Sequence, residues 1–339
     1  MPPHVGDTSS AFLALNRNKR SAVLDLKKPS GKSALLKMVR AYDVLLEQFR
    51  PGVLDRLGLS HATLLAENPK LVVCALTGYG QDGPLAHRAG HDLNYLARGG
   101  VLGMQGPEGA APTVAGHQLA DVSGGLYSVI GIMGALMERA RTGKGQIVDV
   151  AMIETAMPFA IAAFGMSFGG QKHARGAEAL SGGIAPYQTY VTKDGRAMSL
   201  AALEPKFWMT FAASVGHSVD MSDLVPGPHQ ADLKAKLRAI FADKTLAEWV
   251  QFASERDCCL EPVLTPDEAR EDAHLAARGM FFEMDSPWGT IHQMRTPLTP
   301  RDRKHAPPPK QGEHTEAILR DAGLGDADIA AMRAEGAIR

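Results

Sequence analysis

The stretch KLVVCALT, residues 70–77, decides which fold the chain is expected to adopt. It is an apolar run of strand length, which is typical of a strand buried on both faces of a parallel sheet. Two strands are predicted before it, at residues 21–26 (SAVLDL) and 43–49 (DVLLEQF), and helical patterns at residues 29–40 and 61–68 separate the three. Strands that alternate with helices indicate an α/β fold, with an open parallel sheet and flanking helices.

The chain continues from this core with a loop-rich stretch over residues 78–116. Loops at the carboxyl ends of parallel strands are where open α/β sheets bind ligands. Asp121 is then the predicted N-cap of a long apolar helix over residues 122–141, and residues 146–152 are predicted to return as a strand.

The character of the sequence changes near residue 183. Two strand patterns at residues 186–191 and 196–203 flank a Lys-Asp-Gly turn, which indicates a hairpin. We therefore expect a large α/β domain over residues 1–183 and a small α+β domain over residues 184–278. Residues 279–339 are expected to be a strand-rich return segment and C-terminal helices that pack on the large domain.

Composition excludes several classes of protein. The 339 residues carry 36 basic and 37 acidic side chains, so no general attraction to nucleic acid or to a membrane is expected. The three cysteines, Cys74, Cys258 and Cys259, have neither a disulfide framework nor zinc-site spacing. No targeting segment is apparent, and we expect a cytoplasmic protein without a metal site.

Three polar residues occupy positions where α/β scaffolds carry function. His91 lies in a glycine-flanked loop, Asp121 at a helix start and Glu204 at a strand end. Each also has a structural interpretation, because a loop histidine can satisfy a carbonyl, and Asp121 and Glu204 can each simply begin a helix. A basic set could bind a phosphorylated ligand or form a solvated rim; its members are Arg17, Lys19, Arg20, Arg50 and Arg56.

Seven segments together resemble the class III (CaiB/BaiF-type) CoA-transferase family. They are LNRNKRSAVLDLK (15–27), YDVLLEQFRPGVLDRLGL (42–59), NPKLVVCALTGYGQDGP (68–84), GHDLNY (90–95), RTGKGQIVDVAM (141–152), LEPKFW (203–208) and GEHTEAIL (312–319). Within the family, the combination of His91, Asp121 and Glu204 is most similar to the alpha-methylacyl-CoA racemases. The resemblance implies an interlocked homodimer that acts on acyl-CoA in lipid metabolism.

The resemblance also implies roles for particular residues. His91 and Asp121 would carry protons on opposite faces of the acyl α-carbon, and Glu204 would orient His91. CoA enters as part of the substrate, with no separate cofactor, and the implied CoA contacts fall on Leu24, Asp25, Leu26, Lys27, Gln48, Phe49, Arg50, Arg56, Gly90, Asp92, Leu93, Asn94 and Tyr95. The large domain is thus expected to bind CoA.

Three hypotheses about function follow from this resemblance. The first is a 2-methylacyl-CoA racemase that works through an enolate, and the second is a CoA transferase in which Asp121 is the nucleophile. Family members carry about one further βαβ segment before the residue at which this chain starts. The third hypothesis is therefore a truncated, non-catalytic remnant.

Overall fold

The computed structural model describes residues 2–339, and these residues divide into two compact units. The first unit consists of residues 2–75, 130–148 and 265–339, and the second consists of residues 76–129 and 149–264. Each unit is therefore assembled from separate stretches of the chain. The domain boundaries expected at residues 183 and 278 stay a prediction.

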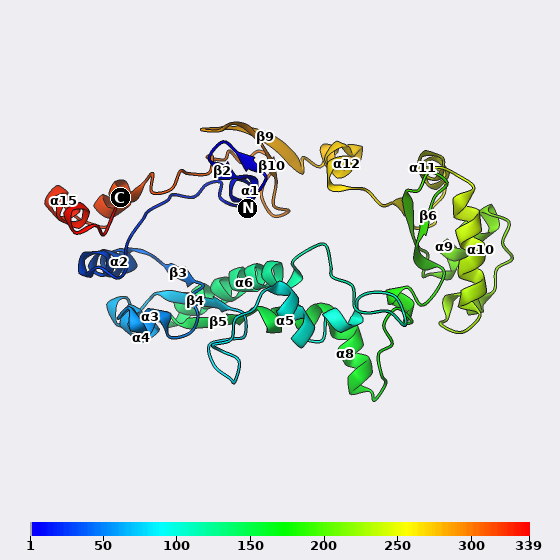
Figure 1. Ribbon diagram of the computed structural model, residues 1–339, viewed down its shortest axis with the longest axis horizontal. Coiled ribbons are helices and arrows are strands. Elements are labelled where there is room, and N and C mark those ends of the chain that lie inside the picture. Colours follow the sequence, from blue (N-terminus) through cyan, green and yellow to red (C-terminus); the bar gives the residue numbers. More distant parts are fainter. Residues whose placement is uncertain (1) are drawn as a thin grey trace. The chain divides into compact units, whose positions relative to one another are not determined.

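A three-stranded sheet in the order β3-β4-β5 forms the α/β core (Figure 1). β3 (Val44–Glu47) pairs in parallel with β4 (Val72–Thr77), from Val44 opposite Val72 to Glu47 opposite Ala75. Four consecutive side chains of β4, from Val72 to Ala75, are fully buried, as the apolar run predicted. β5 comprises Ile147–Ala151. The predicted class, an α/β fold with a parallel sheet and flanking helices, is confirmed.

The strand predicted at residues 21–26 is wrong. The segment forms no strand, and its hydrogen-bond partners are groups near the C-terminal helices. The Asp25 N–H donates to the Ala337 carbonyl at 2.8 Å, the Val23 N–H donates to Thr315 Oγ1 at 3.1 Å, and the Ser21 carbonyl accepts from the His314 N–H at 2.9 Å. The segment is thus held by residues about 300 positions away.

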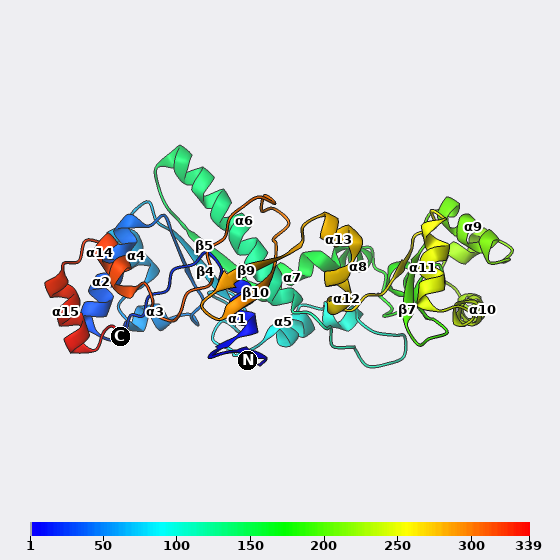
Figure 2. The same ribbon diagram turned by 90° about the horizontal axis from the view of Figure 1, so that it is seen from above.

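The C-terminal helices predicted within residues 279–339 are present. α14 (Thr315–Asp321) and α15 (Asp326–Glu335) share an apolar cluster with α2 (Pro29–Ala41), and both views show α15 beside α2 (Figures 1 and 2). The buried members are Ala34, Leu319, Leu324, Ile329, Met332, Ala337 and Ile338. The two ends of the chain therefore share one core in the first unit.

The remaining elements of the first unit are short. Residues predicted to be strand-rich form an antiparallel hairpin of β9 and β10, with Gly289 opposite Ser286. The elements are β1 (His4–Val5), β2 (Thr8–Ser9), α1 (Ser10–Leu15), α3 (Val53–Arg56), α4 (His61–Glu67), α12 (Pro266–Glu271), α13 (Ala273–Ala277), β9 (Phe281–Ser286) and β10 (Gly289–Met294).

The second unit contains an antiparallel sheet in the order β6-β7-β8, of which β6 is labelled in Figure 1. Buried aromatic side chains form the core beside it. β6 (Tyr187–Val191) and β7 (Ala197–Ala201) form the predicted hairpin, and the three-residue β8 (Leu260–Pro262) adds an edge that no sequence pattern indicated. Tyr190 stacks on Phe241 with ring centroids 4.6 Å apart. Three helices complete this layer: α9 (Pro205–Ser214), α10 (Gln230–Ala242) and α11 (Leu246–Ser254).

Helix α6 (Leu119–Thr142) has two contrasting faces. Gly124 and Gly131 are seven residues apart, close to two turns, so they share one face. A Cβ on Gly131 would lie 2.6 Å from Val148 Cγ1 of β5, and a Cβ on Gly124 would lie 2.8 Å from Met152 Cγ. The opposite face carries exposed apolar side chains, namely Val122, Leu126, Val129, Ile130, Met133 and Met137. Among residues 2–339, α6 is the one helix long and apolar enough to cross a membrane.

Short helices connect these parts of the second unit. They are α5 (Asp92–Arg98), α7 (Met152–Ala156) and α8 (Ile161–Phe168), together with the 3₁₀ helices η1 (Leu102–Met104), η2 (Met157–Ala160), η3 (Ala179–Ser181) and η4 (Met221–Leu224).

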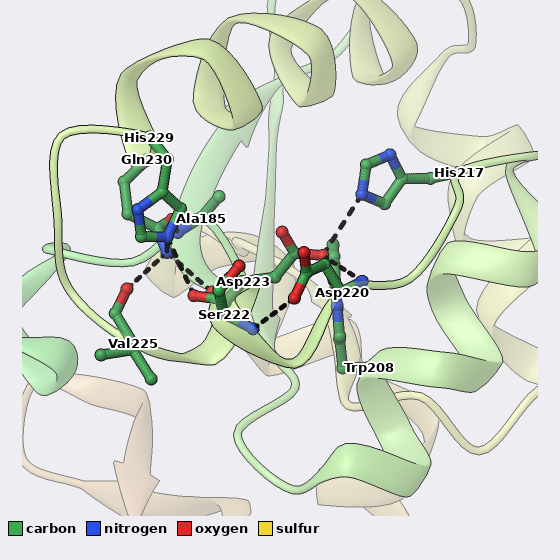
Figure 3. Close-up of polar contacts among 9 residues, drawn as sticks. All are labelled: Ala185, Trp208, His217, Asp220, Ser222, Asp223, Val225, His229 and Gln230. Carbon is green, nitrogen blue, oxygen red and sulfur yellow. Dashed lines mark hydrogen bonds and ion pairs between the residues drawn. The ribbon is translucent and has the colours of Figure 1, made fainter.

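A buried polar network anchors α10 to its surroundings (Figure 3). The Gln230 side chain is 2% exposed; its Oε1 accepts from the Ala185 N–H, and its Nε2 donates to the Asp223 and Val225 carbonyls. The Asp223 carboxylate in turn accepts from Trp208 Nε1 at 3.1 Å. The side-chain amide of Gln230 thus provides the hydrogen-bond partner of three backbone groups.

Gln230→Leu should therefore destabilise the protein. The substitution keeps a similar volume but leaves three backbone groups without their partner, and even one such loss costs about 1–3 kcal/mol of unfolding free energy. Urea unfolding followed by tryptophan fluorescence measures the change, since Trp208 and Trp249 are buried nearby. Gln171→Leu is the control, because Gln171 is exposed. Equal stability of the two variants would contradict the role of the network.

Candidate active site

His91 stands at the start of α5, where it is the N-cap residue. Its backbone N–H donates to Asn94 Oδ1 at 3.1 Å. The residue before it must be glycine, because a Cβ on Gly90 would lie 2.7 Å from Tyr95 Cε1, and Tyr95 Oη donates to the Gly90 carbonyl at 2.6 Å. Local geometry therefore fixes the backbone from which the imidazole projects.

Asp121 lies in the first turn of α6, so its predicted N-cap position is wrong. The helix begins two residues earlier, at Leu119. The first amides of a helix have no partner within it, and here a side chain from α5 supplies one. Asp92 Oδ1 accepts from the Ala120 N–H at 2.6 Å and from the Asp121 N–H at 3.2 Å. Asp92, which sequence reasoning assigned only to CoA, thus joins the starts of α5 and α6.

Electrostatics couple the same three residues. Burial raises the pKa of Asp121 above its ordinary value of 3.8, the negative charge of Asp92 raises this pKa further, and His91 acts in the opposite direction. A carboxyl group whose proton affinity is increased gives up its proton less readily, which favours its acting as an acid as well as a base.

Glu204 has a different environment. It is the N-cap residue of α9, and its carbonyl accepts from the Phe207 and Trp208 amides at 3.0 and 3.2 Å. Burial, and after it the Glu204 charge, raises the pKa of the Cys259 thiol. In the part of the chain that the structure describes, His91, Asp92 and Asp121 are brought together, whereas Glu204 lies beside Cys259.

The predicted CoA contacts in the first unit begin with the loop of residues 24–27. Leu24 and Leu26 pack against the apolar clusters of this unit, and Asp25 Oδ1 accepts from the Lys27 N–H at 2.9 Å. The Lys27 side chain is exposed. A ligand at this loop would therefore meet backbone groups and one lysine.

A second predicted contact loop, residues 48–50, follows β3. Arg50 and Arg56 are exposed, and the Arg56 guanidinium folds back toward Gly52, whose φ is +79°. The buried Glu47 carboxylate shapes this turn, because it accepts from the Phe49 N–H at 2.6 Å and is paired with His61 Nε2 at 3.2 Å. Sequence reasoning missed Glu47, although an acidic residue at the end of an apolar strand is a signal.

The remaining predicted contacts lie in the second unit with His91. The Leu93 side chain is exposed, whereas Tyr95 is buried edge-on against Tyr79, with ring centroids 5.1 Å apart. Tyr79 was also missed, and the aromatic residue between two glycines in GYG was its signal. Across residues 2–339, no group of three or more His, Cys, Asp or Glu side chains is arranged to hold a metal ion.

Comparison with known proteins places this geometry in a family. The family model for CoA-transferase family III matches residues 1–315. The alpha-methylacyl-CoA racemase of Mus musculus is 38% identical over 98% of this chain and 87% of its own length. The succinyl-CoA:glutarate CoA-transferase of the same organism is 29% identical over 94% of this chain and 76% of its own length.

A solved structure agrees. The crystal structure of a CaiB/BaiF family protein from Brucella suis has a TM-score of 0.79 and 31% identity, and the match covers 93% of this chain and 84% of that one. The expected resemblance is thereby confirmed: the chain is an enzyme that belongs to CoA-transferase family III.

Proposed function

We propose that the chain interconverts the two epimers of a 2-methylacyl-CoA by moving the proton on its α-carbon. The observation that carries this proposal is the placement of His91 and Asp121 at the starts of two helices joined by Asp92. The similarity to a racemase along almost the whole chain supports it.

The reaction needs two proton carriers and no other reactant. One group, acting as base, takes the α-proton and leaves the electron pair as an enolate on the thioester oxygen. The other, already protonated, gives its proton to the opposite face of the same carbon, so the total number of bound protons is unchanged. An imidazole and a carboxylate suit these roles because each can both accept a proton and release one.

Substrate binding by the CoA portion is part of the same proposal. Arg50 and Arg56 are exposed cations that flank one turn, and guanidinium groups bind phosphate through two parallel hydrogen bonds. The chain's net charge of −1 makes such a cluster local, which favours a small anionic ligand over a polyanion.

CoA transfer is the alternative, and the glutarate transferase relative favours it. In that reaction the Asp121 carboxylate attacks the thioester carbonyl and expels the CoA thiolate, which leaves an acyl-aspartyl anhydride. The CoA thiolate then attacks the aspartyl carbonyl of this anhydride, which releases the first acid as its carboxylate and leaves an aspartyl-CoA thioester. The acceptor carboxylate attacks that thioester and expels the CoA thiolate again, and attack of the thiolate on the acceptor's carbonyl gives the new acyl-CoA and frees the Asp121 carboxylate.

One experiment separates the two reactions. The protein is incubated in deuterated water with an enantiomerically pure 2-methylacyl-CoA, once alone and once with a dicarboxylate acceptor and hydroxylamine. The proposal expects deuterium at the α-carbon and loss of optical purity without an acceptor. A protein hydroxamate at Asp121 and a new acyl-CoA, with no deuterium uptake, would instead establish transfer.

His91→Ala tests the histidine. Loss of a general base costs roughly 100-fold or more in rate, so we expect α-proton exchange to fall by at least that factor. The dissociation constant for CoA should stay unchanged, because the imidazole acts on the acyl carbon. His87→Ala is the matched control, since His87 is exposed four residues away. Unchanged exchange in His91→Ala would remove His91 from the mechanism.

Asp121→Asn should be inactive under either reaction, and it should also alter the pH dependence of stability. Because burial raises the pKa of Asp121 in the folded chain, the folded state binds more protons than the unfolded state just above pH 3.8. Stability is therefore lost as pH rises through the folded-state pKa, and an amide does not titrate. We expect the variant's unfolding free energy, relative to the parent, to increase from acid to neutral pH; a constant or decreasing difference would contradict this.

We further propose that a second copy of the chain covers the exposed face of α6. Six apolar side chains on one helix face form an unusually large exposed patch for a water-soluble surface. A dimer would also allow Glu204 of one copy to approach His91 of the other, which is the role that the resemblance implies for it. The site would then be complete only in the dimer.

Met133→Glu on this face tests the dimer. Met133 is 58% exposed, and a charge there would disfavour an apolar interface, so we expect dissociation, with loss of activity, or unfolding on dilution. Met209→Glu on α9 is the matched control, at 51% exposure. Sedimentation velocity measures the outcome. A parent chain that is a folded, fully active monomer at low concentration would exclude the shared site.

A further inference from the structure

Asp92 occupies a position that the proposed reaction does not by itself explain. It is the first residue of α5, directly after His91, and its Oδ1 reaches the first turn of α6 rather than the start of its own helix. Its two hydrogen bonds, at 2.6 and 3.2 Å, end on the Ala120 and Asp121 amides. The backbone of one proposed proton carrier is therefore held by the neighbour of the other.

The charge of Asp92 is as informative as its geometry. A helix N-terminus stabilises negative charge and so makes a carboxyl in its first turn more acidic. That effect suits Asp121 as a base but hinders it as an acid, and a two-carrier reaction needs both roles. A second carboxylate at the same helix end opposes the effect of the helix, because like charges disfavour ionisation.

The influences on the pKa of Asp121 have the directions that this opposition requires. Burial is the largest influence that raises the pKa of Asp121, Asp92 is the second, and His91 lowers it. Both charged neighbours come from the start of α5, so replacement of Asp92 alone leaves the imidazole in place.

We propose that Asp92 is a positioning residue that holds the amino end of α6 through its Oδ1 and, through its negative charge, keeps Asp121 able to carry a proton as well as release one. This inference rests on the proposed function, in which Asp121 acts on the α-carbon. It predicts that the hydrogen bonds and the charge of Asp92 have separable effects.

Asp92→Asn separates them, because the amide keeps an Oδ1 acceptor for the two backbone N–H groups and loses the charge. We expect the acid limb of the kcat/KM profile for α-proton exchange to move to lower pH, since Asp121 then ionises more readily. Asp92→Ser, a shorter uncharged acceptor, should move the limb in the same direction. Asp232→Asn, on the exposed face of α10, is the control and should leave the limb in place.

A second measurement keeps this inference distinct from the proposed function. The carboxyl carbon of Asp121, assigned by its absence in Asp121→Asn, is titrated by ¹³C NMR in the parent and in Asp92→Asn without substrate. A lower midpoint in Asp92→Asn supports the inference even if the parent shows no α-proton exchange, which would count against the proposed reaction alone. An unchanged midpoint, or an unchanged acid limb in a variant that exchanges protons, would overturn the role of the Asp92 charge.

Discussion

The parallel pairing of β3 with β4 is the constraint on which the α/β core depends. Every side chain from Val72 to Ala75 is withdrawn from water, which requires cover on both faces of the strand. Around Val73, that cover comes from apolar residues of α2, α3 and α4 and of the loops between them, including Val39, Leu54, Leu59 and Leu64. Because the strands are parallel, their carboxyl ends lie at one edge of the sheet, and the chain leaves that edge toward the loops that carry function.

Carboxylates that accept backbone N–H groups recur where these loops turn. Glu47 receives the Phe49 amide after β3, Asp92 receives two amides of α6, and Asp223 receives the Asp220 amide in the second unit. A charged acceptor forms a stronger hydrogen bond than a neutral one, so each carboxylate stabilises the turn whose amide donates to it. In the case of Asp92, the same charge also reaches a proposed proton carrier.

Glycine has the complementary role of permitting close approach. Gly90 leaves room for the ring of Tyr95, and Gly124 and Gly131 allow α6 to lie directly against neighbouring side chains. A helix that packs through glycines on one side needs little bulk there, which leaves its larger apolar residues for the other side. This division makes α6 both a core helix and a candidate interface.

Sequence patterns were enough to predict the class of fold, the hairpin of the small sheet and the terminal helices, and to mark His91, Asp121 and Glu204 as candidates. Those predictions depend on local periodicity and on motifs, both of which are visible directly along the sequence. The sequence patterns did not reveal that residues 21–26 bond to groups at residue 312 and beyond, that α6 starts at Leu119, or that Asp92 accepts from the amides of its first turn. These hydrogen bonds join groups from about 30 to about 300 positions apart, and each has as its donor a backbone amide, which every residue but proline offers equally. No residue pattern distinguishes such partners, because only the packed chain selects which of them meet.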